Sequence, residues 1–90
     1  MARVLVLIRV LPKEADISPD ILLEKIKKTL PDKYQIVRHQ HEPIAFGLEA
    51  LRMTIVIPEE AGGTENLEQT ISHIDEVGQI DVLSVSRVIE

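Results

Sequence analysis

The sequence predicts an α+β fold, a ferredoxin-like βαββαβ sandwich in which two helices cover one face of a four-stranded antiparallel sheet. Four segments are typical of strands, residues 2–11, 34–41, 51–57 and 80–89, and in the first and third of them apolar residues share one face with period two. Apolar residues with helical spacing lie between the first and second segments and between the third and fourth, as in two right-handed split βαβ units. The 90 residues are expected to form a single domain, residues 1–90.

The first strand and the first helix carry the strongest signals. Ser18 is a favoured N-cap residue, and Pro19 suits the first position of a helix. Pro31 is expected to end that helix, because proline cannot continue it. The strand before the helix has an entirely apolar face, formed by Val4, Val6, Ile8 and Val10.

The boundaries of the later elements are marked by proline and glycine. Pro43 is expected to end or bend the second strand. Thr64 is placed to cap the second helix and Gly78 to close it. The stretch EPIAFGLEAL, residues 42–51, is expected to form the turn between the second and third strands, and it holds the only phenylalanine of the chain.

Composition narrows the classes of function. The chain has no cysteine, which excludes disulfides and thiolate metal sites. It has 10 basic and 15 acidic residues and only two aromatic ones, Phe46 and Tyr34. Direct nucleic-acid binding favours a basic face with aromatic stacking platforms, so we expect a protein partner with a basic patch instead.

The sequence contains no stretch approaching the roughly 20 apolar residues of a membrane span, so no membrane contact is expected and a cytoplasmic location is predicted. No set of serine, histidine and aspartate can be nominated for nucleophilic catalysis, and Gly62-Gly63 indicates a turn rather than a phosphate-binding loop.

Two alternatives stay open from the residues alone. His39 and His41 project from one face of the second strand with Glu42 nearby, a set of ligands that could hold zinc. A small-molecule-binding regulatory module with a ferredoxin-like fold is the other alternative, because such sites are built from backbone and varied side chains.

The stretch PIAFGLEALRMTIVI resembles the signature of the guanine-nucleotide exchange domain of the translation elongation factor 1-beta family. The similarity continues through VLIRVLPKEADIS, GGTENLEQTISHIDEV and IDVLSVSRVIE, and so covers essentially the whole chain. The resemblance implies a ferredoxin-like sandwich that is not an enzyme and has no cofactor of its own. It also implies an activity: release of GDP from elongation factor 1-alpha, so that GTP can bind during translation elongation.

The resemblance further implies which residues bind the partner. Family members present the phenylalanine that matches Phe46 on a loop at one end of the sheet, where it docks into the GTPase. Ile44 and Gly47 belong to the same motif, and Gly47 permits backbone angles that a bulky residue could not take. In eukaryotic relatives a lysine near the chain end reaches the magnesium and phosphate site of the GTPase. Arg87 matches it by position, with arginine in place of lysine and three residues following.

Overall fold

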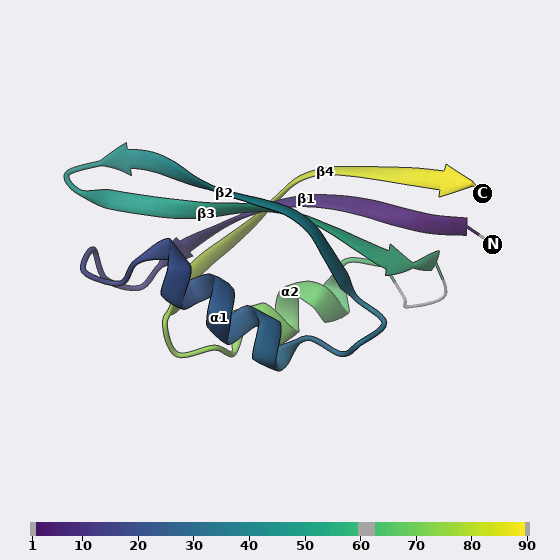
Figure 1. Cartoon of the computed structure of the whole chain (residues 1–90), viewed down its shortest axis with the longest axis horizontal. Coiled ribbons are helices and arrows are strands. Elements are labelled where there is room, and N and C mark those ends of the chain that lie inside the picture. The colour runs from purple at the N-terminus through teal and green to yellow at the C-terminus, as the bar shows by residue number, and fades with distance from the viewer. Residues whose placement is uncertain (1, 60–62, 90) are drawn as a thin grey trace.

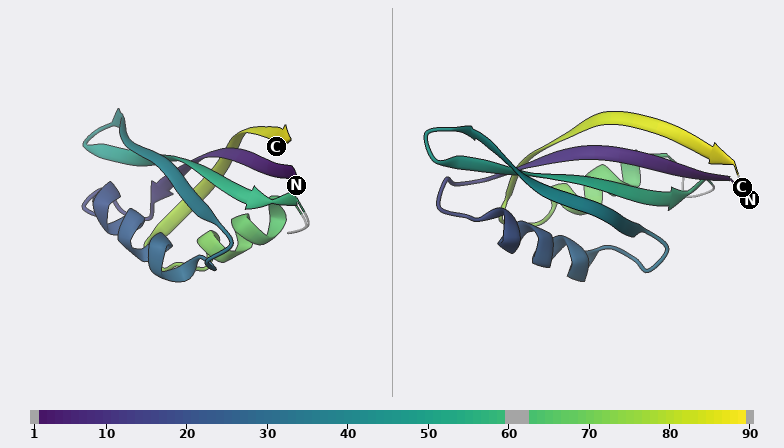
Figure 2. Two further views of the ribbon diagram at one scale, coloured as in Figure 1. Left: turned by 45° about the vertical axis from the view of Figure 1, so that its right-hand side comes forward. Right: turned by 45° about the horizontal axis from the view of Figure 1, so that its top comes forward.

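The computed structural model describes residues 2–59 and 63–89 and confirms the predicted βαββαβ order (Figure 1). The strands form one antiparallel sheet in the order β2-β3-β1-β4, and both helices lie on the same face of it (Figure 2). No helix in this part of the chain is long and apolar enough to cross a membrane. The elements are β1 (Ala2–Pro12), α1 (Pro19–Thr29), β2 (Gln35–Ala45), β3 (Leu48–Pro58), α2 (Glu65–Ser72) and β4 (Val77–Ile89).

The core lies between the helices and the central strands β1 and β3. Alternate residues of both strands point toward the helices, as their period-two pattern predicts. Burying one such aliphatic side chain contributes roughly 1.5–3 kcal/mol. The largest fully buried side chains are Val6, Ile8, Val10, Leu22, Ile26, Leu51, Met53, Ile55, Ile57, Leu67 and Ile71.

Helix α1 begins and ends where the sequence predicts. The Oγ of Ser18 accepts a hydrogen bond from the backbone N–H of Ile21 at 3.3 Å, which satisfies one of the unpaired N–H groups of the first turn. At the other end, the N–H of Leu30 donates to the carbonyl of Ile26 at 2.9 Å, and Pro31 follows.

The turn between β2 and β3 is much shorter than predicted. Strand β2 continues through Pro43 to Ala45, and β3 begins at Leu48, so only two residues connect the strands. Proline is tolerated here because β2 is an edge strand, where a missing N–H need not remove a hydrogen bond from the sheet. The pairing register shifts between Pro43 and Ala45, which accommodates the proline.

Gly78 does not close the second helix, contrary to the prediction. Helix α2 ends at Ser72, Thr64 makes no side-chain cap, and Gly78 is the second residue of β4. A Cβ atom at position 78 would lie 2.9 Å from both the Cα of Lys13 and the carbonyl oxygen of Pro12. The glycine is therefore required by a close approach of two backbones, not by a helix terminus.

The variant Gly78→Ala is expected to lower the free energy of unfolding by about 1–3 kcal/mol, because the backbone atoms it meets cannot move aside freely. Urea denaturation measures this change. The matched control is Ser86→Ala, at an exposed position of the same strand, which should change stability by less than about 0.5 kcal/mol. Equal urea midpoints of unfolding for the two variants would contradict the close approach of the Gly78 backbone to the backbone of Pro12 and Lys13.

Candidate partner-binding site

The β2–β3 hairpin extends beyond the rest of the sheet. β1 pairs with β3 only as far as Val10 opposite Leu51, whereas β2 and β3 continue to pair up to Ala45 opposite Leu48. Figure 1 shows this overhanging hairpin at the left end of the molecule, beyond the helices. Side chains at its turn are consequently remote from the core.

Contacts on both faces hold the base of the hairpin. On the face without helices, Glu42 accepts hydrogen bonds from Arg9 at 3.4 Å and Arg52 at 3.3 Å. On the helix side, the Nε2 of His41 lies 3.0 Å from the Oδ1 of Asp20 in α1. Such partly exposed pairs contribute little stability individually. Together they attach β2 to the neighbouring strands and to α1, and so fix the direction in which the hairpin points.

The two-residue turn has an unusual backbone. Both residues have positive φ, 53° at Phe46 and 79° at Gly47. Positive φ at both positions is the requirement of a type I′ turn, whose twist matches that of the flanking strands. Glycine adopts this conformation readily, as expected for Gly47, but a bulky residue does so rarely and at a strain of order 1–3 kcal/mol. Phe46 therefore occupies a position for which phenylalanine is intrinsically unsuited.

The ring of Phe46 also makes no contribution to the core. Its relative exposure is 102%, so the largest apolar side chain of the chain stands entirely in solvent. The neighbouring Ile44 is 43% exposed. Ile44, Phe46 and Gly47 thus form an apolar tip at the end of the hairpin, which we call the hairpin tip.

Arg87 lies at the other end of the molecule. It stands in β4 opposite Val4 of β1, whereas the hairpin tip lies beyond the Val10 end of that strand. Its Nε and Nη2 donate to the two carboxylate oxygens of Glu59 at 2.6 and 3.0 Å. The molecule measures 42 × 20 × 17 Å, and the β2–β3 turn and the C-terminal end of β4 lie at opposite ends of its long axis (Figure 1). The structure therefore does not bring these two predicted sites together.

The two histidines of β2 are arranged differently from a metal site. His39 and His41 are opposite Met53 and Leu51, and so lie on the helix side of the sheet. The ring of His41 contacts Asp20 and, at 3.8 Å, Glu49. Among residues 2–59 and 63–89 no group of three or more histidine, aspartate and glutamate side chains is positioned to hold a metal ion.

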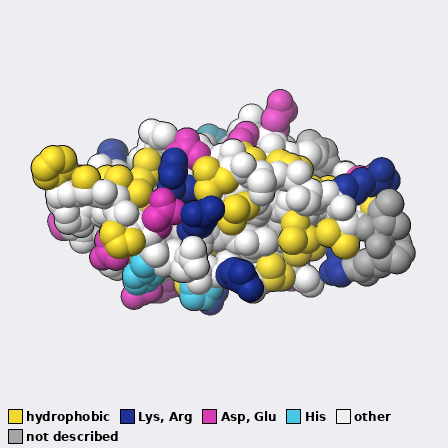
Figure 3. Space-filling view, turned by 90° about the horizontal axis from the view of Figure 1, so that it is seen from above, with side chains coloured by type: hydrophobic (Ala, Val, Ile, Leu, Met, Phe, Trp, Pro, Cys, Tyr) yellow, Lys and Arg dark blue, Asp and Glu magenta, His cyan; other side chains and the backbone are white. Residues whose placement is uncertain are grey.

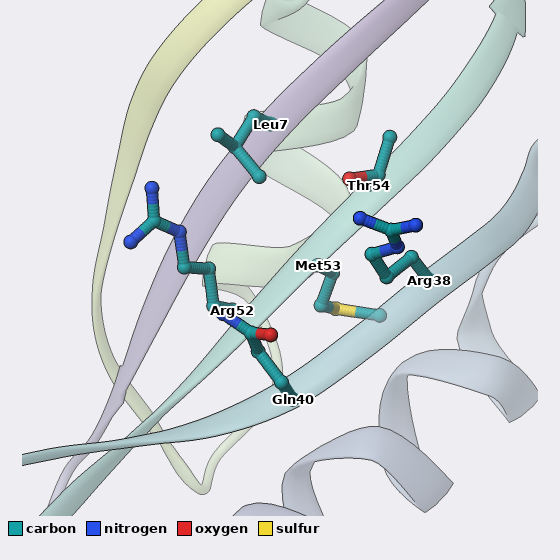
Figure 4. Close-up of a pocket in the computed structure, with 6 residues that line it drawn as sticks. All are labelled: Leu7, Arg38, Gln40, Arg52, Met53 and Thr54. Carbon is teal, nitrogen blue, oxygen red and sulfur yellow. The ribbon is translucent and has the colours of Figure 1, made fainter.

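Sequence reasoning missed a hollow of about 350 Å³ on the sheet face that carries no helix. The available signal was one or more arginines in each of three strands (Arg3, Arg9, Arg38 and Arg52), but only the strand register shows that they share a face. Its lining residues, shown in Figure 4, are Leu7, Arg38, Gln40, Arg52, Met53 and Thr54.

These features define a small ferredoxin-like domain whose exposed apolar tip is suited to contact with another protein. The sequence model of the EF-1 guanine nucleotide exchange domain matches residues 5–88, and the chain belongs to this family. It is 56% identical over 88 residues to elongation factor 1-beta of Thermofilum pendens, a match that covers 97% of each chain. It is 51% identical over 89 residues to elongation factor 1-beta of Staphylothermus marinus, covering 98% of this chain and 99% of the relative.

Solved structures show the same fold at low identity. The C-terminal domain of the MgtC protein from Mycobacterium tuberculosis superposes with a TM-score of 0.54 at 11% identity, covering 94% of this chain and 85% of that one. The structure described as BlrP1 BLUF gives a TM-score of 0.57 at 16% identity, covering 100% of this chain and 57% of that one. At such identities the likeness concerns the fold alone.

The family and its relatives support a guanine-nucleotide exchange role in translation elongation. They do not favour a small-molecule-binding regulatory module. An exchange domain changes the occupancy of a binding site on another protein, so the family is one of exchange factors rather than catalysts.

The variant Phe46→Asn is expected to raise the free energy of unfolding by about 1 kcal/mol, because asparagine tolerates positive φ and Asn-Gly is the favoured pair in this turn. Thermal and urea unfolding measure the gain. Phe46→Ala removes the ring but keeps a side chain that disfavours the turn, so its stability should change by less than about 0.5 kcal/mol. A large loss in Phe46→Ala would show that the ring is packed in the native protein.

Proposed function

We propose that this chain promotes exchange of GDP for GTP on elongation factor 1-alpha by contacting that GTPase at two separate places, the hairpin tip and the Arg87 end. The observation that carries the proposal is the combination of full exposure and positive φ at Phe46. It acts in the cytoplasm as a binding factor, without a cofactor and without catalysing a covalent step.

Positive φ at Phe46 lowers the stability of the free protein, and the fully exposed ring makes no packing contact that would offset this cost. Residues held in sparsely populated backbone regions are concentrated at functional sites, where the surrounding structure imposes them. Burying the ring in a partner would recover roughly 1.5–3 kcal/mol. Because the base of the hairpin is already held by Glu42 and His41, little ordering entropy is lost when the ring docks.

Arg87 is the residue we propose for the magnesium and phosphate site of the GTPase. A permanently charged guanidinium can occupy the place of a cation near phosphates. In the free protein it is held by Glu59, but both side chains are largely exposed, so the pair is weak and can be released on binding. Because Phe46 lies at the far end, it contacts a different part of the partner.

Exchange then follows because binding of the factor and binding of GDP to the GTPase are thermodynamically coupled. A factor that binds preferentially to the nucleotide-free GTPase lowers the affinity for GDP, and GDP lowers the affinity for the factor by the same ratio. Accelerating GDP release by about a thousandfold requires lowering the barrier by about 4 kcal/mol. A buried aromatic ring together with one charge near the phosphates accounts for a substantial part of that.

The first test measures release of a fluorescent GDP analogue from elongation factor 1-alpha. The wild-type chain should accelerate release, and Phe46→Asn should reduce the acceleration about tenfold or more, since the docking contribution of the ring is lost while the fold is kept. Val37→Ala, which shortens an exposed apolar side chain of β2 away from the turn, serves as the control and should behave as wild type. An unchanged release rate with the wild-type chain would refute the proposed function.

The second test distinguishes a direct contact of Arg87 with the GTPase from a purely structural role of its ion pair with Glu59. Arg87→Gln should lower the exchange rate about tenfold or more, because a charge-assisted contact to the phosphates is lost. Glu59→Gln should leave the rate equal to or above that of the wild type, because the guanidinium no longer has to leave its carboxylate. If both variants lowered the rate equally, the pair would be structural and Arg87 would not enter the partner.

A further inference from the structure

The sheet face that carries no helix, which we call the open face, has side chains arranged in rows across the strands. Residues paired between neighbouring strands point to the same side of a sheet. One row across the open face runs Arg38, Thr54, Leu7 and Ser84, and the next runs Gln40, Arg52, Arg9 and Asp81. The hollow lies between these two rows, near the middle of the molecule and away from both ends.

Most polar groups around the hollow have no partner in the described chain. The side chains of Arg38, Gln40 and Thr54 make no hydrogen bond or ion pair with another residue of the described segments. Arg52 uses only Nη1, which donates to Glu42 at 3.3 Å. Figure 4 shows Arg52 and Gln40 on one side of the hollow, Arg38 with Thr54 on the other, and Leu7 above them. The hollow therefore presents unused donors from opposite sides.

The charge of the open face differs from that of the whole chain. Four of the five arginines lie on it, and among residues 2–59 and 63–89 two carboxylates, Glu42 and Asp81, pair with Arg9 and Arg52 there. The rest of the chain has six basic and thirteen acidic residues. In Figure 3, which looks onto this face, basic side chains lie among apolar and acidic ones. The open face is thus positively charged on a protein whose net charge is −5. These arginines are Arg3, Arg9, Arg38 and Arg52.

The open face also has apolar side chains at and beside the hollow. Leu5 lies opposite Val56, and Leu7 belongs to the lining of the hollow itself. Neither aromatic residue of the chain is on this face, because Phe46 is in the turn and Tyr34 is buried. A face without aromatic rings provides no platform for base stacking, whereas guanidinium groups next to leucine suit a segment with both carboxylates and aliphatic side chains.

We propose that the open face binds an acidic, partly apolar segment of a partner protein, with a carboxylate held between Arg38 and Arg52 and aliphatic side chains against Leu7 and Leu5. This surface is separate from the hairpin tip and from Arg87, and the proposal does not depend on the exchange activity.

The test is a titration of the ¹⁵N-labelled full chain with an acetylated peptide of alternating leucine and glutamate, followed by amide chemical shifts. Shifts should be concentrated at residues 5–7, 38–40 and 52–54. Arg38→Gln should weaken binding about tenfold, because it removes a charge-assisted contact. Lys13→Gln, which removes the same charge at an exposed position outside the strands, should leave the affinity within about twofold of wild type.

Three further titrations determine the chemistry of the ligand. A peptide of alternating leucine and glutamine should bind at least about tenfold more weakly than the glutamate peptide. Inorganic phosphate and a single-stranded oligouridylate should also bind more weakly through these amides. The proposal is overturned if the glutamine peptide binds equally well, if phosphate or RNA binds more tightly than the glutamate peptide, or if Arg38→Gln and Lys13→Gln have the same effect.

Discussion

The burial of alternate residues in β1 determines how the rest of the sheet is oriented. Val6, Ile8 and Val10 are completely buried under the helices, and β1 pairs with both β3 and β4. A register slip of one residue would place Arg9 in the core and expose its aliphatic neighbours, so the register is strongly specified. This constraint also assigns the arginines of β1 and β3 to the open face. The alternation of β1 therefore determines both which residues enter the core and which lie on the open face.

The same register leaves the β2–β3 hairpin without support from β1 beyond Val10. A two-stranded ribbon is only marginally stable in isolation. Here Glu42 on one face and His41 on the other connect its base to residues of β1, β3 and α1. The positive φ at Phe46 is imposed by the pairing of Ala45 with Leu48 across the two-residue turn, although the ring itself contacts no core residue.

Much of the fold was predictable because β1, β3 and α1 follow simple periodicities and α1 has a clear N-cap at Ser18. The hairpin turn was not predictable, because Phe-Gly lacks the Asn-Gly signal and Pro43 suggests a break that an edge strand does not require. Gly78 was misassigned because its close neighbour, the backbone of Lys13, is distant in sequence.

The candidate sites were predictable to different degrees. The motif around Phe46 was recognisable from its residues, whereas the pairing of Arg87 with Glu59 joins residues 28 positions apart. The hollow was hidden by a register shift between Ile36 and Arg38. Simple alternation from the buried side of Ile36 would place Arg38 toward the helices, and the shift moves it to the open face. Counting along the sequence cannot detect such a shift.

The elongated shape has a consequence for the salt dependence of any complex made through both ends. At physiological ionic strength the screening length is about 8 Å, far shorter than the 42 Å length of the molecule, so the two ends are electrostatically independent. Added salt would weaken the attachment of the guanidinium end while leaving burial of the aromatic ring largely unaffected. At high ionic strength the complex would then be tethered by the hairpin alone.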